Sequence, residues 1–461
     1  MNFVFYDAEA TGPEPRHDQM LHVAAVLADG DLEERECFSL RSRLKPHQLP
    51  TPMALLLTGL SVQAVTDPAL PSHDEMVHDL HRRFSAWQPA IFTGYSSLEF
   101  DEELLAHSLR ASLLPPRLTT APGNARLDVQ RLALAVETFA PGAIAFTRRH
   151  DGAPSFRLSE LARANGIAHP NAHDALGDVR TTLALARLIR SSVPWLWDHM
   201  VEMGRADAAA GFASSHPVRL YTEFHHNRPH HWLVTALGNG TDGLVEVVGF
   251  DLERDPEKGR ALSGEALRRW VSRNPKPIRP IRVAECPFIL PRERAAGLPG
   301  IPRFDDEELD RRAALLAADA GYRSRLIAAY AETARNREIP DDTYAPISFH
   351  AATWPDRASM AKAFAEPGLR ARALRLIFDE RPDLLQESTR MRFESETAAR
   401  LLESKDNVPW TTLTRAFDAT DAAFEHAATE DVDRLEGLIA YLKKELAWAE
   451  ALDQSRLKPN S

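Results

Sequence analysis

The first dozen residues constrain this chain more than any other stretch. Residues 2–6 form an apolar run with aromatic and β-branched side chains, typical of a buried strand, and lead into Asp7-Ala8-Glu9. Because side chains alternate along a strand, Asp7 and Glu9 point to the same side, about 6–7 Å apart. Two such carboxylates repel each other and are costly to desolvate, and a divalent cation would relieve both problems. The alternative is a strand that runs out into a solvated acidic turn.

Two further carboxylates and one histidine follow later in the chain. Asp101 lies where the loop after the expected strand 90–95 gives way to a helix. Asp178 lies one turn into an amphipathic helix, and His173 lies in the loop just before it. Carboxylates from separate segments suit magnesium or manganese. Taken alone, Asp101 is equally well a helix N-cap, and a surface or loop position is the commoner outcome for a histidine such as His173.

Composition describes an ordinary globular protein of several domains. The chain has 461 residues, of which 44% are hydrophobic and 26% charged, which suggests about three domains. No apolar stretch reaches the roughly 18 residues that a spanning helix needs. The chain enters the acidic strand directly after Met1, and a cleavable signal would remove that strand, so we expect a cytoplasmic protein. Cys37 and Cys286 are the only cysteines, which fits a reducing compartment.

The net charge of -11, summed over the whole chain, argues against a protein that binds nucleic acid. Residues 254–282 oppose this sum with a local basic run and with Trp232 and Trp270 available for stacking, a combination that suits single-stranded nucleic acid. The basic residues are Arg254, Lys258, Arg260, Arg268, Arg269, Arg273, Lys276, Arg279 and Arg282. The alternative is a solvated face with core tryptophans.

Patterning predicts three regions of different structure. Strands are expected at residues 21–27 and 36–40, joined by a two-residue Asp29-Gly30 turn. Small residues at 204–217 suggest a linker, after which short strands separated by turn signals suggest a small barrel. These strands are expected at residues 218–223, 231–237, 244–250 and 281–284. From about residue 305 the apolar stripes are helical. The expected domains are 1–200, 215–350 and 351–461.

Four histidines in a short stretch, His225, His226, His230 and His231, raise the question of a metal site. A transition-metal site needs three or four converging ligands, and the spacing does not guarantee convergence. An exposed or DNA-facing loop is the preferred interpretation.

The order Asp7-x-Glu9, Asp101, His173-x4-Asp178 resembles the DEDDh class of 3′→5′ exonucleases. Within residues 1–195, further motifs resemble the bacterial exodeoxyribonuclease I family: Leu49-Pro50-x-Pro52 to Thr58-Gly59, Gly94-Tyr95 to Phe100-Asp101, Pro154-Ser155-Phe156-Arg157-Leu158, Asn165-Gly166-Ile167 and Asn171-Ala172-His173-Asp174-Ala175. The chain departs from the family at Ser96-Ser97, where asparagine is usual, and matches loosely near Tyr344 and Phe349.

The resemblance implies an α/β fold with an RNase H-like mixed-sheet exonuclease domain, an SH3-like β-barrel domain and an all-α C-terminal domain. It implies magnesium-dependent 3′→5′ hydrolysis of single-stranded DNA to 5′-mononucleotides, in DNA repair and recombination. Two Mg²⁺ ions, for which Mn²⁺ can substitute, serve the two ends of such a displacement. The expected ligands are Asp7, Glu9, Asp101 and Asp178, with His173, whose intrinsic pKa is near neutral, as general base.

The resemblance also implies contacts beyond the metals. The expected substrate-binding residues are Ala8, Thr11, Gly12, Ser97, Phe100 and Arg157. The expected partners are single-stranded DNA and the acidic C-terminal tail of single-stranded DNA-binding protein, which the helical domain would receive in a groove. No membrane partner is expected, and a monomer is the default because the sequence has no long heptad repeat.

Three rival functions remain open at the level of sequence. The same chemistry on RNA differs only in contacts to the 2′-hydroxyl, which no motif here reveals. A non-catalytic adaptor for single strands or partner proteins would keep the acidic cluster as a relic. A polymerase-bound proofreading subunit is disfavoured by the long regions that follow the first domain.

Overall fold

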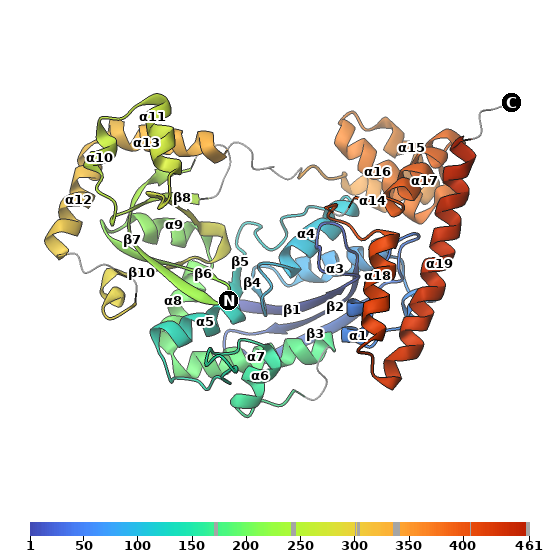
Figure 1. The fold of residues 1–461 in the computed structure, drawn as a ribbon, viewed down its shortest axis with the longest axis horizontal. Helices are drawn as coiled ribbons and strands as arrows, with labels where there is room; N and C mark the ends of the chain where they lie inside the picture. The colour runs from blue at the N-terminus through green and yellow to red at the C-terminus, as the bar shows by residue number, and fades with distance from the viewer. Residues whose placement is uncertain are drawn as a thin grey trace.

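The computed structural model describes residues 1–169, 174–240, 246–299, 301, 305–334, 342–405 and 407–457. Its first sheet has the strand order β3-β2-β1-β4-β5, with β1 at the centre (Figure 1). The strands are β1 Asn2–Ala10, β2 Met20–Ala28, β3 Glu34–Arg41, β4 Ala90–Gly94 and β5 Ala125–Asp128. β2 runs antiparallel to β1 and β4 runs parallel to it, so the predicted mixed sheet is confirmed.

Helices cover both faces of this sheet because β1 is apolar on both sides. Phe3 and Phe5 point into one hydrophobic core, with α5, α7 and α8, whereas Val4 and Tyr6 point into the other, with α3 and α4. The helices of this part are α1 Pro52–Thr58, α2 Val62–Val65, α3 His73–Ala86, α4 Asp101–Ala111, α5 Val129–Phe139, α6 Leu158–Ala164, α7 Ala175–Ser192 and α8 Pro194–Met203. Strand β1 continues through Glu9, so the acidic pair lies within the sheet and not in a solvated turn.

The predicted two-residue turn at Asp29-Gly30 is wrong. β2 ends at Ala28 and β3 begins at Glu34, which leaves a five-residue loop. The Asp29 carboxylate accepts hydrogen bonds from the backbone N–H groups of Asp31 and Glu33, and the side chain of Leu32 is buried. Side-chain capping by Asp29 and burial of Leu32 therefore favour the longer loop over a tight hairpin.

The predicted linker at 204–217 is also wrong. This segment contains α9 Ala206–Ser214, whose buried residues are Ala209 and Ala213. Alanine is the best helix former, and its small side chain lets the helix lie close to β7, β8 and β10. The first and second sheets are thus joined by packed structure.

The second sheet has the strand order β10-β6-β7-β8-β9, with every neighbouring pair antiparallel. Its strands are β6 Arg219–His225, β7 Arg228–Asn239, β8 Glu246–Asp251, β9 Ile278–Arg282 and β10 Phe288–Pro291. The first, second and fourth predicted strands are recovered with shifted ends, and the start of the third, at 244–245, lies outside the described residues. β10 was not predicted, because four residues flanked by prolines give no periodicity. An SH3-like closure of this sheet stays a prediction.

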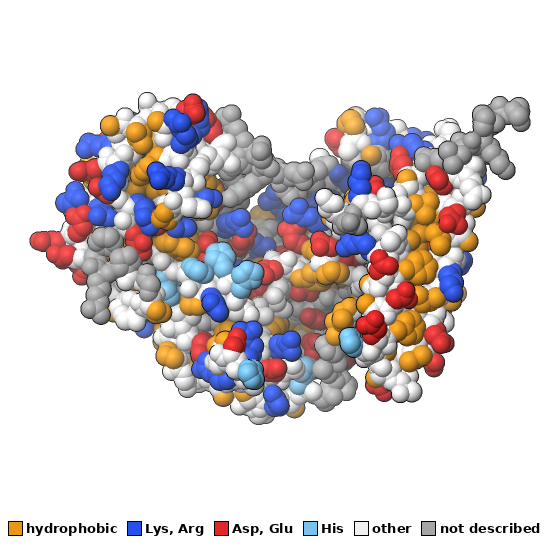
Figure 2. Space-filling view, in the orientation of Figure 1, with side chains coloured by type: hydrophobic (Ala, Val, Ile, Leu, Met, Phe, Trp, Pro, Cys, Tyr) orange, Lys and Arg blue, Asp and Glu red, His pale blue; other side chains and the backbone are white. Residues whose placement is uncertain are grey.

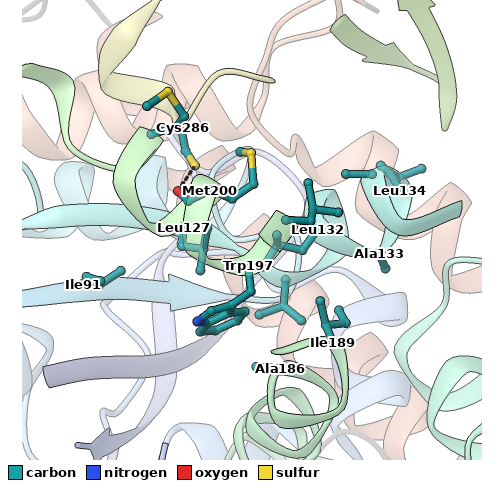
Figure 3. Close-up of a cluster of buried hydrophobic side chains, with 14 of the residues drawn as sticks. Ile91, Leu127, Leu132, Ala133, Leu134, Ala186, Ile189, Trp197, Met200 and Cys286 are labelled. Carbon is teal, nitrogen blue, oxygen red and sulfur yellow. Dashed lines mark hydrogen bonds between the residues drawn. The ribbon is translucent and has the colours of Figure 1, made fainter. Parts of the chain in front are cut away.

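The two sheets share a hydrophobic core. Figure 3 shows Cys286, from the segment before β10, beside Met200 of α8 and in one cluster with Trp197, and the Cys286 thiol lies 3.4 Å from the backbone oxygen of Met200. Burial raises the pKa of this thiol to about 12, so Cys286 is a small core residue.

The remaining elements of the chain are helices; those from about residue 305 were predicted, whereas the two at residues 257–272 were not. They are α10 Glu257–Arg260, α11 Gly264–Ser272, α12 Asp306–Ala318, α13 Ala320–Ala334, α14 Ile347–Ala351, α15 Trp354–Ala363, α16 Pro367–Glu380, α17 Glu387–Leu401, α18 Leu413–Phe424 and α19 Thr429–Leu457; short 3₁₀ turns are η1 Val283–Glu285, η2 Arg292–Ala295 and η3 Pro382–Leu384. α12 and α13 pack on the second sheet, whereas α17, α18 and α19 pack against α1, on the opposite side of the molecule (Figure 1). Across the described ranges, no helix combines the length and apolarity that crossing a bilayer requires.

Candidate active site

Strand β1 and helix α7 bring three carboxylates together. Asp7 and Glu9 project from the same face of β1, and Asp178 projects from the first turn of α7, which packs against that strand. One oxygen atom from each of the three lies within 4.8 Å of the other two. Among the described residues, this is the only group of three or more side chains that could jointly hold a metal ion.

Asp101 lies beside this group and is bonded to the same strand. It is the first residue of α4, and its Oδ1 accepts a 2.9 Å hydrogen bond from the backbone N–H of Ala8. The N-cap position belongs to Phe100, which makes no side-chain capping bond. The N-cap alternative for Asp101 is therefore wrong, and its carboxylate is directed at the strand that carries Asp7 and Glu9.

The carboxylates are electrostatically unfavourable in the absence of a cation. Burial, followed by the charges of Asp101, Glu9 and Asp178, raises the pKa of Asp7 well above its ordinary value. Burial and Asp178 raise the pKa of Glu9 to about 7. Burial is also the largest cause of the raised pKa of Asp101. Hard oxygen donors that repel one another in a buried site fit a divalent cation such as Mg²⁺ or Mn²⁺.

The predicted general base, His173, lies in 170–173, outside the described residues. A histidine that we did not predict, His169, does contact the cluster: its Nε2 lies within hydrogen-bonding distance of the Asp178 carboxylate. The sequence carried a weak signal for it, because His169 and His173 lie four residues apart in one loop before Asp178. A hydrogen bond of this kind fixes the orientation of a carboxylate that could hold a metal.

The loop that leaves β1 holds two of the predicted substrate-binding residues. The backbone N–H of Thr11 donates to the Gln19 carbonyl oxygen, and its hydroxyl donates to the Asp18 carboxylate. A Cβ added at Gly12 would lie 2.7 Å from the same carboxylate, so only glycine fits there. Thr11 and Gly12 therefore shape the loop beside the acidic cluster.

The remaining predicted substrate-binding residues differ in exposure. Ser97 is buried, and its carbonyl oxygen accepts from the Glu102 N–H, whereas Phe100 packs against the core between β1 and α4. Ala8 uses its N–H to bind Asp101. Arg157 is exposed and has no ion-pair partner in the part of the chain that the structure describes. Of these residues, Arg157 is the most accessible to a ligand.

Asp128, a residue that we did not predict, holds the Ser96-Ser97 turn. It is buried, and its two carboxylate oxygens accept from the backbone N–H groups of Ser96 and Leu98. Ser96 has a φ of 61°, which serine rarely adopts. Hydrogen bonds to Asp128 thus fix the Ser96-Ser97 turn, where the chain departs from the exodeoxyribonuclease I pattern.

The basic run at 254–282 is largely paired. Arg268 contacts Glu332, and Arg279 contacts Asp251 while its guanidinium covers the Trp232 ring at 4.1 Å. Trp270 lies beside Phe250 in the core of the second sheet. The solvated-face alternative therefore accounts for much of this run, and Trp232 already has a cation on its ring.

The four clustered histidines do not converge on a metal site. Nδ1 of His231 hydrogen-bonds with the Thr222 hydroxyl, and His225 contacts Glu223. The histidines contribute to no group of three metal-capable side chains in the described ranges. The predicted loop is nevertheless wrong for three of them: His225 ends β6, and His230 and His231 lie in β7, where His231 is buried.

Residues 4–186 match the RNase T exonuclease family. Exodeoxyribonuclease I of Haemophilus influenzae is 31% identical over 203 residues, which are 44% of this chain and 42% of that protein. The Escherichia coli exodeoxyribonuclease I is 31% identical over 202 residues, 43% of this chain and 42% of that protein. The predicted resemblance is confirmed. The sequence match nevertheless spans only about two fifths of the length of these relatives.

The fold is similar over almost the whole chain. A moderately thermophilic exonuclease I from Methylocaldum szegediense superposes with a TM-score of 0.79 at 23% identity, over 96% of this chain and 99% of that one. Escherichia coli exonuclease I in complex with a dA16 oligonucleotide superposes with a TM-score of 0.77 at 20% identity, over the same shares. The predicted exonuclease fold, with its helical C-terminal region, is therefore confirmed.

Proposed function

We propose that this chain is a divalent-metal-dependent 3′→5′ exonuclease that degrades single-stranded DNA to 5′-mononucleotides, in DNA repair and recombination. The observation that carries the proposal is the convergence of Asp7, Glu9 and Asp178 on one point within a domain of the exonuclease family. The choice of DNA is supported by relatives that are exodeoxyribonucleases and by a similar structure with a bound dA16 oligonucleotide.

In the proposed mechanism, Asp7, Glu9, Asp101 and Asp178 would hold two Mg²⁺ ions. When bound, the ions supply charge stabilisation for the attacking and the leaving oxygen of the scissile phosphodiester. His173 takes the proton from the attacking water, a role that suits an imidazole with a near-neutral pKa. The chain positions these groups through two hydrogen bonds, from Ala8 N–H to Asp101 and between His169 and Asp178.

The shape of the molecule supports a polymeric substrate. Figure 2 shows a hollow between the lobe of the second sheet and the C-terminal helices, and both basic and acidic side chains lie on its floor. A strand entering this hollow would have the first sheet beneath it (Figure 1). Basic side chains in a recess attract phosphates even when the whole protein is acidic.

The test is magnesium-dependent digestion of 5′-labelled single-stranded DNA and RNA of matched sequence. We expect a ladder that shortens from the 3′ end on DNA and that is lost in Asp7→Ala. Asp31→Ala is the matched control, because Asp31 is an exposed acidic residue in the loop after β2. Equal or better digestion of RNA would make the protein an exoribonuclease. No metal-dependent digestion of either would favour the binding-module alternative.

The partner and assembly predictions belong to the same proposal. We propose that the acidic C-terminal tail of single-stranded DNA-binding protein binds the helical domain, and that the protein acts as a cytoplasmic monomer. A pull-down with a tail peptide and a peptide of scrambled sequence tests the first statement, and light scattering tests the second.

A further inference from the structure

A second cluster of like charges lies beyond the catalytic strand. A cavity of about 490 Å³, which we call the Arg400 pocket, lies between the loops after β1 and β3, helix α4, and helices α16 and α17. Its volume falls in the range of small-molecule sites. The basic residues that line it are Arg16, Lys45, Arg110, Arg372, Arg375 and Arg400. These segments are far apart in the sequence and meet only in the folded chain.

The acidic residues of the pocket do not balance this charge. Three line it, and one of them, Asp379, contacts both Arg375 at 2.8 Å and Lys45 at 3.8 Å. A second, Asp18, accepts from the Thr11 hydroxyl and the Glu14 N–H. Six basic residues therefore line the pocket with three carboxylates, two of which have other partners, while Arg16 and Arg110 also pair with Glu103 and Asp342 outside its lining.

The third carboxylate, Glu396, has its ion pair with Arg392, outside the pocket. Arg400 is left without an ion pair or a side-chain hydrogen bond to any described residue, although its guanidinium is largely buried over the Trp410 ring. Burial and Arg375 lower the pKa of Arg400, which reports an unfavourable environment for its charge. A guanidinium does not lose its proton at physiological pH, and the charges of Asp18 and Asp379 offset this cost only in part, so a bound anion would relieve it further.

Two of the histidines that line the pocket have pKa values lowered mainly by burial and also by its basic residues. Burial, then Lys45 and Arg110, lower the pKa of His107 to about 3. Burial and Arg400 lower the pKa of His17. Both imidazoles are therefore neutral at pH 7, and each keeps one N–H that can donate to a bound anion.

We propose that the Arg400 pocket binds a phosphate group, as inorganic phosphate or as the terminal phosphate of a mononucleotide. Guanidinium forks bind phosphate oxygens in pairs, and several of them around one cavity suit an anion of charge near two. A terminal phosphate carries more charge than a backbone phosphodiester, and it fits a cavity of limited size. Its described lining residues form no cluster that could hold a cation, so the pocket differs from the acidic site in its ligand chemistry.

The pocket is connected to the catalytic strand through one loop. Thr11 lies two residues after Glu9, and it hydrogen-bonds with Asp18 and Gln19, both of which line the pocket. An anion bound there would contact the loop that leaves β1. If the proposed function is correct, the mononucleotide product is formed close to this second site. Binding itself does not depend on that function.

The experiment is calorimetric titration of the full chain with inorganic phosphate and, separately, with dTMP, in the presence of EDTA. EDTA leaves the acidic cluster without a cation, so phosphate cannot be recruited there. We expect saturable binding with a dissociation constant of about 1 mM or below. Arg400→Gln should weaken it by about tenfold or more, the effect of losing a charge-assisted contact. Arg370→Gln, an exposed arginine of α16 that does not line the pocket, should leave it unchanged.

Three results would overturn the proposal: no saturable binding by the wild type, equal binding by Arg400→Gln, or displacement of phosphate by an oligonucleotide without terminal phosphates. The last result would assign the pocket to the backbone of a strand. Circular dichroism checks that the variant folds. If it does not, Arg400→Lys, which keeps the charge but not the fork, should give a few-fold loss. Because catalysis is not measured, failure here is distinct from failure of the proposed exonuclease function.

Discussion

The loop that leaves β1 connects two clusters of like charges, one negative and one positive. Before it, Asp7 and Glu9 lie with Asp178 in a group of carboxylates that repel one another. After it, residues 16–19 enter a pocket where cations outnumber carboxylates and Arg400 forms no ion pair with any described residue. Neither cluster is explained by stability, because buried like charges cost free energy.

The two clusters differ in the number of chain segments that supply their side chains. The carboxylates come mainly from one strand and the first turn of one helix, and neighbouring hydrogen bonds orient them. The cations come from five separate segments, and their side chains are long and less constrained. We therefore expect strict geometry and metal selectivity in the first cluster, and tolerant binding of any compact dianion in the second.

The largest expected effect follows from Asp7→Asn, which removes one charge and keeps the shape. Activity should fall by about three orders of magnitude or more, since a metal ligand is lost. In EDTA the same variant should melt at a higher temperature than the wild type, because the remaining carboxylates repel less. Added Mg²⁺ should raise the melting temperature of the wild type only.

Asp31→Asn serves as the control, because Asp31 is exposed and lies away from the cluster. A variant that lost activity but melted no higher than the wild type in EDTA would show that the cluster carries no repulsion. The acidic cluster would then not share with the Arg400 pocket the repulsion between like charges.

The sequence predicted the acidic cluster because its main determinant is local. Alternation along β1 alone places Asp7 and Glu9 on one face, and one helical turn places Asp178. The Arg400 pocket could not be predicted in this way, because its walls lie more than 350 residues apart in the chain. Only tertiary packing brings Arg16 and Lys45 to Arg400.

The errors in the fold have equally specific causes. The small residues at 204–217 fit a linker and a helix equally well, and packing of Ala209 and Ala213 decided for α9. The Asp29-Gly30 pair is a strong turn signal, but burial of Leu32 required a longer loop. In both places local propensity was overruled by contacts with distant parts of the chain.

A smaller loss of activity is expected when a metal-binding carboxylate keeps its charge but loses the hydrogen bond that orients it. His169→Ala removes the hydrogen bond to Asp178 but leaves the carboxylate, so activity should fall by about 10–100-fold. The Mg²⁺ concentration that gives half-maximal activity should rise at the same time. His150→Ala, an exposed loop histidine, is the matched control and should behave as the wild type. If His169→Ala is fully active, the acidic cluster does not need this support.

Thermal melting can separate the two clusters in one experiment. A ligand present at 100 times its dissociation constant stabilises the folded state by about 2.7 kcal/mol. Phosphate should therefore raise the melting temperature of the wild type and of Asp7→Asn, but much less that of Arg400→Gln. Mg²⁺ should raise it for the wild type and Arg400→Gln, but not for Asp7→Asn. If one substitution abolished both shifts, the loop between the clusters would couple them into a single site.

The smallest effect concerns pH, which acts on the carboxylates and not on the guanidinium groups. Glu9 has a pKa of about 7 in the folded protein without metal, above its ordinary value of 4.5. Protonated Glu9 therefore contributes stability that is complete below pH 4.5 and is lost as the pH rises through 7. Protons also compete with the cation, so Mg²⁺ affinity should fall as the pH drops below 7. Melting curves between pH 5 and 8 in EDTA should show a destabilisation with rising pH that is smaller in Glu9→Gln, whereas Asp31→Asn, at an exposed position, should keep the wild-type slope. A slope of the opposite sign would mean that Glu9 is already stabilised by a neighbouring positive group, and the contrast between the two clusters would not hold.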